Sequence, residues 1–327
     1  MSKNKVTVLI IAGVMLLAGI IFCIVSLFSV PRTDGNGGDG SPADKPRPVV
    51  SIEDSIPADA AEFQVAEVQR INVEMAEDDL TFFPYVGGTT IRVQIDEAVR
   101  DRYDVYAEDG TLNVKRKSGV SLFTEPRDVV LWLPAGFLQS GDIHAETASG
   151  DIDVNQIFGG GSLTLNSASG DIEMIDCRFA AITVETASGE IDADRTVCGG
   201  MMKLNSTSGN VELTGCELAD ITAETVSGEV ELDQTTVSGT ARLNSTSGDH
   251  KLTGCDFADI TAETTSGSVE LRLRGPVTEY GVSAETVSGT VNGMYNMVGG
   301  KKVSVSTTSG DITIAFETDA SETEQGV

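Results

Sequence analysis

The chain has few basic residues for its size. It carries 22 lysines and arginines against 50 aspartates and glutamates, which gives a formal charge of −28. The corresponding pI is near 4.2. A polyanion of this kind repels phosphate backbones instead of attracting them. The charge balance therefore argues against a nucleic-acid partner.

The usual catalytic signatures are also missing. There is no nucleophile elbow, no phosphate-binding glycine loop and no Cys-x-x-Cys pair, and the two histidines are His144 and His250. Carboxylates are abundant, but they recur periodically and lack a clustered set of arginines or lysines. Acid–base catalysis needs two carboxylates in different environments, which equivalent periodic carboxylates do not supply. We therefore predict that the protein is not an enzyme, with no catalytic residue and no bound cofactor. A polysaccharide-acting β-helix enzyme is the remote alternative.

Helical periodicity is absent, and a longer period takes its place. Ser-Gly pairs recur every 19 to 22 residues through the second half of the chain, with glycines at Gly150, Gly170, Gly189, Gly209, Gly228, Gly248, Gly267, Gly289 and Gly310. A fixed period near 20 is typical of repeat architectures in which one unit stacks on the next. We predict an all-β fold, a single-stranded β-solenoid with one coil per unit. A 39-residue coil containing two units is the competing interpretation. Glycine is expected in each turn because the backbone there is left-handed or otherwise strained.

Apolar and polar residues alternate within each unit, as in strands with one buried face. Ile221 and Ala223 precede a Ser-Gly turn at inward positions, and Val230 and Leu232 follow it. The sequence therefore predicts that the inside of each coil is lined from both sides of the turn.

Some polar residues also fall at inward positions. His250 takes the place that Val230 holds one coil earlier, and we expect a neutral ring with a local hydrogen bond. Inward Ser and Thr residues recur at Thr147, Ser167, Thr186, Ser206, Thr225 and Ser245. Their hydroxyls are expected to bond from coil to coil.

The outward residues after each turn are mainly acidic and form columns along the coils. One column holds Asp151, Asp171 and Glu190, and the next holds Asp153, Glu173 and Asp192. Since neighbouring coils are about 4.8 Å apart, like charges should raise the pKa values of these carboxyls. These six residues are the candidate metal site, a cation-binding surface with calcium as the candidate ion. Cationic peptides, envelope polymers or envelope proteins are the candidate partners, and a passive solvated face is the alternative.

Before each turn the outward pattern differs, because glutamate and asparagine alternate. The column reads Glu146, Asn166, Glu185, Asn205, Glu224, Asn244 and Glu263. Alternation doubles the distance between glutamates and so reduces their repulsion. Lys203 and Arg242 precede asparagines by two residues, which places them diagonally to the flanking glutamates.

The cysteines of the repeats follow the same rhythm. Cys177, Cys216 and Cys255 are 39 residues apart, so in the single-coil interpretation they lie in every second coil, about 9.6 Å apart. That separation exceeds the roughly 7 Å limit between the Cα atoms of a disulfide. Cys198 falls in the coil between the first two. We predict four buried free thiols, with a bridge to Cys198 as the alternative.

The first thirty residues have a different composition. Residues 6–30 carry no charge and are long enough to cross a bilayer. Lys3 and Lys5 precede this run, which favours a cytoplasmic N-terminus. A cleaved signal peptide would usually have an apolar core of only about 7–15 residues. We predict a cytoplasmic stub and transmembrane anchor over 1–30 and a Gly/Pro/Asp-rich linker over 31–49. The solenoid would then lie extracytoplasmically in a single-pass protein of the cell membrane.

Residues 50–138 lack the Ser-Gly rhythm and hold most of the large aromatic side chains, including the one tryptophan. Asp109-Gly110 and Gly87-Gly88 each separate two strand-like runs, as in hairpins. The open end of a solenoid has to be covered. We interpret this region as an atypical N-terminal β cap with the first coils, and an aromatic binding patch is the alternative. Regular repeats then fill 139–316, and 317–327 is expected to be an acidic disordered tail.

Three motifs resemble a known family. They are Tyr-Asp-Val-Tyr-Ala-Glu-Asp-Gly-Thr-Leu-Asn-Val-Lys-Arg-Lys at 103–117, Val-Leu-Trp-Leu-Pro-Ala-Gly at 130–136, and the Glu-Thr-x-Ser-Gly-(Asp/Glu)-Ile units that end at Ile314. Together they resemble the bacterial "putative adhesin" family of β-strand-repeat domains, whose function is largely unknown, over about 65–316. The resemblance implies a β-solenoid on the cell envelope, often with a membrane anchor and without catalytic residues.

The expected function follows from these features together. We expect a membrane-anchored, surface-exposed, non-enzymatic adhesin-like solenoid that presents acidic faces for binding. A regulatory or sensing component of a bacterial envelope-stress response is the alternative.

Overall fold

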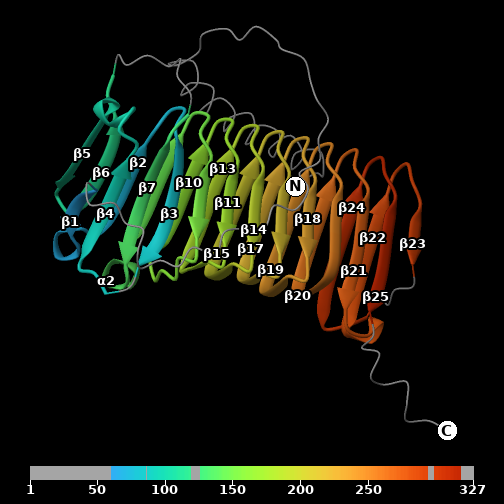
Figure 1. Ribbon diagram of the computed structural model, residues 1–327. Coiled ribbons are helices and arrows are strands. Elements are labelled where there is room, and N and C mark those ends of the chain that lie inside the picture. The colour runs from blue at the N-terminus through green and yellow to red at the C-terminus, as the bar shows by residue number, and fades with distance from the viewer. Residues whose placement is uncertain (1–59, 86, 119–125, 294–297, 318–327) are drawn as a thin grey trace, which may run out of the picture. The chain divides into compact units, whose positions relative to one another are not determined.

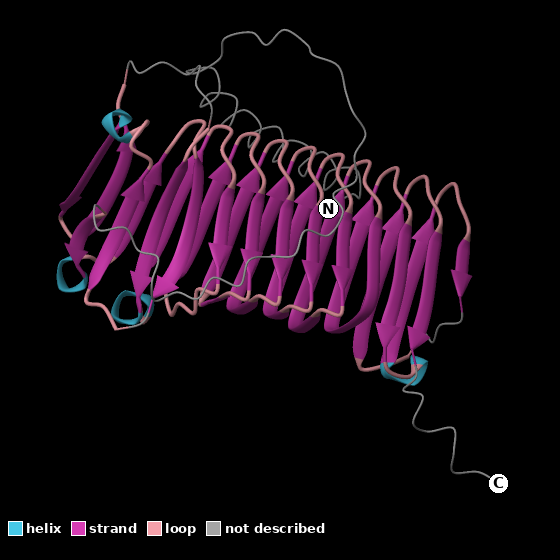
Figure 2. Ribbon diagram, in the orientation of Figure 1, coloured by secondary structure: helices cyan, strands magenta, loops and turns pink. Residues whose placement is uncertain are grey.

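The strands lie side by side in two facing layers (Figure 1). The computed structural model describes residues 60–85, 87–118, 126–293 and 298–317. Within these ranges helix is limited to single turns, as Figure 2 shows, and most pairings between strands are parallel. We call the two layers sheet A and sheet B. The all-β solenoid predicted from the repeats is confirmed.

Each regular coil contributes a strand to sheet B, passes through its Ser-Gly turn and contributes a strand to sheet A. Sheet A contains β1 (Ala61–Gln64), β3 (Asp79–Tyr85), β4 (Thr90–Ile95), β7 (Asp128–Pro134), β9 (Ile152–Asn155), β11 (Ile172–Ile175), β14 (Ile191–Asp194), β16 (Val211–Thr214), β18 (Val230–Asp233), the first part of β20 (His250–Thr264), β21 (Val269–Arg274), β23 (Val291–Gly293) and β25 (Ile312–Glu317). Sheet B contains β2 (Arg70–Glu74), β5 (Tyr103–Glu108), β6 (Thr111–Arg116), β8 (Asp142–Thr147), β10 (Ser162–Ser167), β12 (Arg178–Phe179), β13 (Ala181–Thr186), β15 (Val197–Ser206), β17 (Glu217–Thr225), β19 (Thr236–Ser245), the second part of β20, β22 (Tyr280–Thr286) and β24 (Lys301–Thr307). The helical turns are η1 (Val65–Glu67), η2 (Arg100–Arg102), α2 (Ala135–Leu138) and η3 (Val277–Glu279).

The register of the strands settles the length of one coil. Glu173 of β11 lies between Asp153 of β9 and Asp192 of β14. In sheet B, Glu185 of β13 lies between Asn166 and Asn205. Neighbouring positions are thus 19 or 20 residues apart in both sheets, so the single-unit coil is confirmed and the 39-residue coil is wrong.

The core fills the space between the two sheets. The predicted inward residues Ile221, Ala223, Val230 and Leu232 are all fully buried. Equivalent apolar residues of the other coils join them in one continuous hydrophobic cluster that extends into the N-terminal cap. Burial of this stripe is the main stabilising term of each coil, at roughly 25 cal/mol per Å² of apolar surface.

The Ser-Gly glycines have a role that differs from the expected one. Among the described residues, the glycines with positive φ are Gly87, Gly110, Gly215, Gly254, Gly275 and Gly293, and none belongs to a Ser-Gly pair. A Cβ on Gly189 would lie 2.0 Å from the carbonyl oxygen of Gly170, and one on Gly209 would lie 1.8 Å from that of Gly189. The backbones of successive coils touch at this point, so no side chain fits. The prediction of a strained turn was wrong, and close packing of the backbone is the reason for glycine.

The inward hydroxyls confirm the prediction in part. Thr186 Oγ1 accepts a hydrogen bond from the backbone N–H of Gly189 at 3.0 Å, and Ser206 Oγ accepts one from Gly209 at 2.8 Å. These two hydroxyls therefore complete the turn of their own coil. The predicted coil-to-coil bonds occur where Ser245 Oγ donates to Thr264 Oγ1 at 2.8 Å and where Thr147 Oγ1 donates to the carbonyl oxygen of Ala76 at 3.2 Å.

The order of the coils departs from the order of the sequence at both ends. At the C-terminal end, β24 and β25 lie between β20 and β21 on one side and β22 and β23 on the other. At the N-terminal end, β2 and β3 lie between β6 and β7 on one side and β8 and β9 on the other. The expectation that each unit stacks on the one before it is thus wrong for the terminal coils. As a result, the first and last coils of the chain have neighbours on both sides, which opposes fraying.

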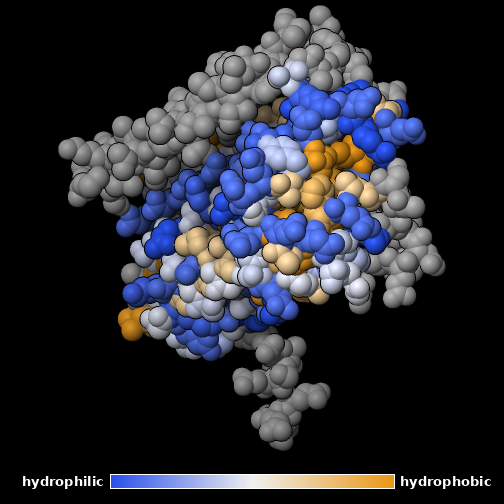
Figure 3. Space-filling model, turned by 90° about the vertical axis from the view of Figure 1, so that its left-hand side faces the viewer, coloured by the Kyte–Doolittle hydropathy of each residue, from blue (hydrophilic) through white to orange (hydrophobic). Residues whose placement is uncertain are grey.

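The N-terminal region adds antiparallel strands to this end. β5 and β6 form the predicted hairpin, with positive φ at Asp109 and Gly110. The Gly87-Gly88 turn does not make a hairpin, because β4 pairs with β1 and β7 and not with β3. Figure 3 looks onto this end and shows hydrophobic side chains with hydrophilic ones around them.

The aromatic residues of this region are mostly core. Phe82, Tyr85, Tyr103, Trp132 and Phe137 are buried, whereas Tyr106 is 38% exposed. These side chains therefore do not form an extended aromatic binding patch. Phe123 lies outside the described residues.

The four cysteines of the repeats are buried and unbridged, as predicted. The thiols of Cys177, Cys216 and Cys255 donate to carbonyl oxygens of the preceding coil at 3.1 to 3.3 Å. Burial raises the pKa of Cys177 to about 12, so the thiol stays neutral. Cys198 pairs in register with Phe179 and lies in a different column.

No helix in the described ranges is long and apolar enough to cross a membrane. The predicted span over 6–30 and the linker over 31–49 lie outside these ranges, as does the tail after Glu317. Glu317 itself is the last residue of β25.

Candidate functional site

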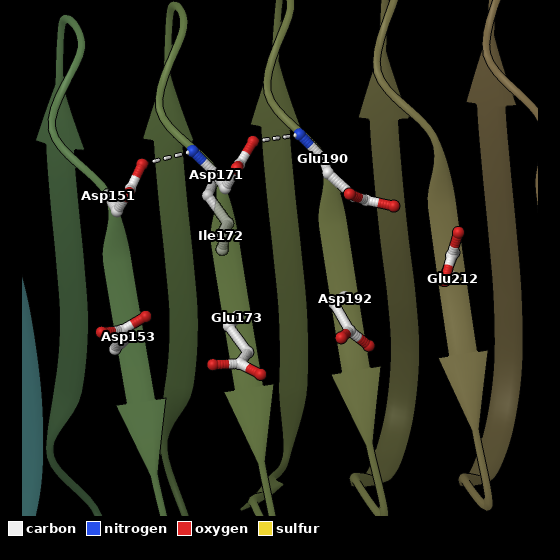
Figure 4. A pocket seen from close by; sticks show the side chains of 8 residues that line it. All are labelled: Asp151, Asp153, Asp171, Ile172, Glu173, Glu190, Asp192 and Glu212. Carbon is white, nitrogen blue, oxygen red and sulfur yellow. Dashed lines mark hydrogen bonds between the residues drawn. The ribbon is translucent and has the colours of Figure 1, made fainter. Parts of the chain in front are cut away.

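The six predicted carboxylates lie together on the outward face of sheet A. They line a depression of about 310 Å³ formed by Asp151, Asp153, Asp171, Ile172, Glu173, Glu190, Asp192 and Glu212. Figure 4 shows these side chains on successive coils, one row at the exit of the Ser-Gly turns and one row in the strands. We call this surface the acidic trough. It arises because identical coils repeat the same outward positions at the spacing of a sheet, about 4.8 Å.

The row nearest the turns is a hydrogen-bonded ladder. Asp151 Oδ1 accepts from the backbone N–H of Asp171 at 2.8 Å, and Asp171 Oδ1 accepts from that of Glu190 at 2.7 Å (Figure 4). Asp79 begins the ladder by accepting from the N–H of Asp151 at 2.9 Å. These carboxylates satisfy backbone donors that the turn would otherwise leave open. Part of the acidic composition therefore has a structural cause.

Two carboxyls of the second row have raised pKa values. The pKa of Asp153 is raised to about 6, chiefly because burial disfavours its charged form and secondly because of the nearby Glu173 carboxylate. The pKa of Glu212 is also raised, first by burial and then by its contact with Glu190. The raised pKa of Asp153 agrees with the predicted direction. The predicted cause was incomplete, because burial is the largest single cause of the shift.

The trough is part of a longer acidic run with defined ends. In register, Asp153, Glu173, Asp192, Glu212 and Glu231 occupy one outward column of sheet A. The column begins beside Thr81 of β3 and ends at Lys251 of β20, whose Nζ pairs with Glu231. Five carboxylates thus follow one another in successive coils before the first cation appears in the column.

A closed metal centre is not formed by these residues. Within the described part of the chain, no three His, Cys, Asp or Glu side chains converge closely enough to hold a metal ion. In the ladder row, Asp151 and Asp171 each already have one oxygen engaged with a backbone N–H. Calcium binding across the trough stays a prediction.

The two histidines do not build a catalytic centre in the described residues. His144 is exposed on β8, with Nε2 4.0 Å from Glu146 Oε2. His250 is inward and buried, as expected, but neither ring nitrogen has a hydrogen-bond partner. The local hydrogen bond that we predicted for His250 is therefore absent, because the groups that surround the ring are apolar.

Two acidic neighbours of the six carboxylates were not among the candidate cation-binding residues. Glu212 continues the column of Asp192 one coil further, where the repeat period places it. Asp79 could not have been found in this way, because its coil lacks a Ser-Gly pair and is aligned only by the pairing of β3 with β9.

Comparison with known proteins found one family model and several solved structures that are similar to this chain. A family model described as Toastrack DUF4097 matches residues 68–315. Among solved structures, the chain is similar to a "putative adhesin" from Bacteroides fragilis, at 12% identity and a TM-score of 0.44, over 78% of this chain and 95% of that one. A "putative lipid binding protein" from Parabacteroides distasonis is similar at 18% identity and a TM-score of 0.41, over 78% and 96%. A "putative cell adhesion protein" from Clostridium sporogenes matches at 12% identity and a TM-score of 0.23, over 79% and 98%.

No relative was found among curated proteins. The family match covers most of the chain and agrees with the resemblance carried by the three sequence motifs. The chain belongs to the Toastrack DUF4097 family, a family of unknown function.

Proposed function

We propose that this protein is a non-enzymatic, adhesin-like binding protein, held in the cell membrane by residues 6–30, which binds cationic partners on the acidic trough. The observation that carries the proposal is the run of five carboxylates in successive coils of sheet A. A long column of like charge is unfavourable by itself, because neighbouring carboxylates repel each other. A cationic ligand that spans several coils would relieve that repulsion and stabilise the fold by mass action.

The trough suits an extended ligand better than a compact one. Its charges recur about every 4.8 Å along the solenoid axis, so a chain of amines or guanidinium groups meets a carboxylate in every coil. The trough lies on the outward face of sheet A, where dissolved salt screens its charges. Its affinity for a cationic ligand should therefore fall steeply as the salt concentration rises. An extracytoplasmic cationic peptide or a cationic envelope polymer has this chemistry.

Binding of an eight-residue lysine peptide to the full-length protein in detergent tests this proposal. The trough variant is Asp153→Asn, Glu173→Gln and Asp192→Asn, and the matched control removes three charges from sheet B by Glu146→Gln, Glu185→Gln and Glu224→Gln. We expect the trough variant to lose at least tenfold in affinity and the control to lose less than threefold. Equal losses would mean that net charge alone attracts the peptide and would overturn the proposal.

Calcium and magnesium form a second arm of the test. Thermal melts of the full-length protein in millimolar calcium, millimolar magnesium and sodium at constant ionic strength are compared with melts of the trough variant. A stabilisation by calcium that the trough variant lacks supports a bridging ion. Identical melting temperatures in all three salts would leave the peptide as the ligand class and exclude calcium.

The membrane topology has its own test. A tag placed after Val327 should be digested when protease is added to intact cells whose outer layers have been permeabilised, because the solenoid is expected outside the cytoplasm. Full protection of the tag would contradict the proposed location.

A further inference from the structure

His250 is a buried imidazole in a column of aliphatic residues. It lies in β20 with Val230 of β18 and Val269 of β21 as its register neighbours, and it is 1% exposed. Neither Nδ1 nor Nε2 has a hydrogen-bond partner. A polar ring in this state costs free energy even when neutral, because its two nitrogens have left water without replacement bonds.

The surroundings of the ring hold no inward charged side chain among the described residues. The inward side chains of the neighbouring strands in sheet A are apolar, namely Val230, Leu232, Val269 and Leu271, as are Ala241, Leu243, Ile260 and Ala262 of the facing strands in sheet B. Nearest the turn, the facing strands carry the inward hydroxyls of Ser245 and Thr264, which bond to each other at 2.8 Å and are not partners of the ring. The titratable inward group on the same strand is the Cys255 thiol, whose pKa burial raises to about 11, so it stays neutral. The carboxylate that acts on the ring is Asp249, the preceding residue, which is exposed. Glu231, Lys251 and Glu270 occupy the outward positions of the same strands.

Protonation is therefore strongly coupled to exposure of the ring. Burial lowers the pKa of His250 from 6.5 to about 4. Since the pKa is lower in the folded state, the opened or unfolded state binds more protons between about pH 6.5 and 4. Stability is then fully present above about pH 6.5 and is lost as the pH falls through this window.

We propose that His250 is a proton-operated release point, which opens the coils around β18, β20 and β21 in an acidic medium while the N-terminal coils stay closed. The device is local because every other inward position after a Ser-Gly turn in the described coils is aliphatic, as at Ile152, Ile172, Ile191, Val211, Val230, Val269, Val291 and Ile312. Each coil contacts only its neighbours, so an opening at one coil need not spread along the solenoid. The inference is independent of the acidic trough, whose deepest residues lie on β9, β11 and β14.

Hydrogen exchange of the full-length protein in detergent, followed by mass spectrometry from pH 7.5 to 4.5, tests the proposal. After correction for the intrinsic exchange rate, peptides from β18, β20 and β21 should lose protection by up to tenfold per pH unit below about pH 6. Peptides from β9, β11 and β14 serve as the internal reference and should not lose protection in this range.

Variants separate the ring from the surrounding carboxylates. His250→Val restores the aliphatic column and should abolish the acid-dependent loss, whereas the exposed His144→Val should leave it unchanged. Placing the ring elsewhere, by Val211→His in the His250→Val background, should move the loss to β14, β16 and β18. An unchanged loss in the His250→Val protein would overturn the proposal.

A direct titration keeps the proposal falsifiable if the relocated variant does not fold. Exchange of the imidazole C2 hydrogen reports the pKa and the accessibility of each histidine, and the chain has only two. His250 should titrate near pH 4, and its C2 hydrogen should exchange more slowly at neutral pH than that of His144. Titration of His250 at the ordinary value of a histidine, near 6.5, would contradict the proposal.

Discussion

The two sheets of the solenoid share one coil spacing but distribute charge in different ways. On sheet B the outward column alternates Glu185, Asn205 and Glu224, and Lys203 Nζ lies 3.2 Å from Glu185 Oε1. On sheet A the corresponding column places five carboxylates in successive coils before Lys251. Thus sheet B alternates charged with neutral residues and pairs Glu185 with a lysine, whereas sheet A accumulates negative charge.

This difference helps to separate the acidic residues that the fold requires from those that it merely accommodates. Since the backbone geometry of both sheets is the same, sheet B shows that a stable column can avoid adjacent like charges. The ladder row of sheet A has a structural reason for its acids, because Asp151 and Asp171 accept backbone N–H groups. In the second row five carboxylates follow one another, and the pKa of Asp153 is raised to about 6. The second row is therefore where a binding function is best sought.

Val230→Asp tests which side chains of sheet A face the core and which face solvent. A carboxylate at this fully buried position should cost about 4 kcal/mol or more and should unfold the affected coils. Glu231→Val, at the next and outward position, should change stability by less than about 1 kcal/mol. Thermal melts measure both. Similar behaviour of the two variants would show that the faces were assigned wrongly.

Both sheets share one coil spacing, which the close contacts of the Ser-Gly glycines maintain. Gly209→Ala places a Cβ 1.8 Å from the carbonyl oxygen of Gly189, so neighbouring coils must move apart. We expect a loss of about 3 kcal/mol in chemical unfolding, at the upper end of overpacking effects. Ser208→Ala is the matched control at an exposed position and should be nearly silent. A silent Gly209→Ala protein would mean that the coils are not in contact at this turn.

The charge accumulated on sheet A predicts a pH response that centres on Asp153. The pKa of Asp153 is about 6 in the folded state and near 3.8 in the unfolded state. Its contribution to stability is therefore greatest below about pH 3.8 and is lost as the pH rises through 6. Asp153→Asn should stabilise the protein by about 1 kcal/mol at pH 7.5, after allowance for solvent screening, and should remove the gain on mild acidification.

Glu185→Gln on sheet B is the control for this measurement. It removes a carboxylate that has a lysine partner, so it should not stabilise the protein at pH 7.5. Chemical denaturation at pH 7.5, 6 and 5 gives the comparison. Equal pH slopes for the wild-type and Asp153→Asn proteins would remove the energetic distinction between the two faces.

The smallest expected effect concerns the ion pair of sheet B. Lys203→Met breaks the contact with Glu185 and should cost at most about 0.5 kcal/mol, because the pair is solvent-exposed. The cost should disappear in 1 M salt. A double-mutant cycle with Glu185→Gln isolates the pair. A coupling energy above about 1.5 kcal/mol would show that this ion pair stabilises sheet B far more than we expect.

Much of the candidate site could be predicted because it is a local property of the repeat. Alternation with period two assigns Asp153 and Glu173 to the outside, and the period of 19 or 20 residues brings them into one column. The contact between Asp79 and Asp151 was not predictable in this way, because it joins residues 72 positions apart through a coil without the motif. The raised pKa of Asp153 was predictable in direction, but its main cause is burial, which depends on the neighbouring coils.

The sequence by itself determined the repeat period, the inward stripe and the acidic columns, since each follows from residue spacing within one or two units. Only the tertiary structure decided the order of the terminal coils, the contact of glycine backbones and the missing partners of His250. The physical reason is that strand alternation is a property of neighbouring residues. The pairing of strands instead selects among several nearly equivalent sheet edges. The packing of side chains depends on residues across the core that are distant in the sequence.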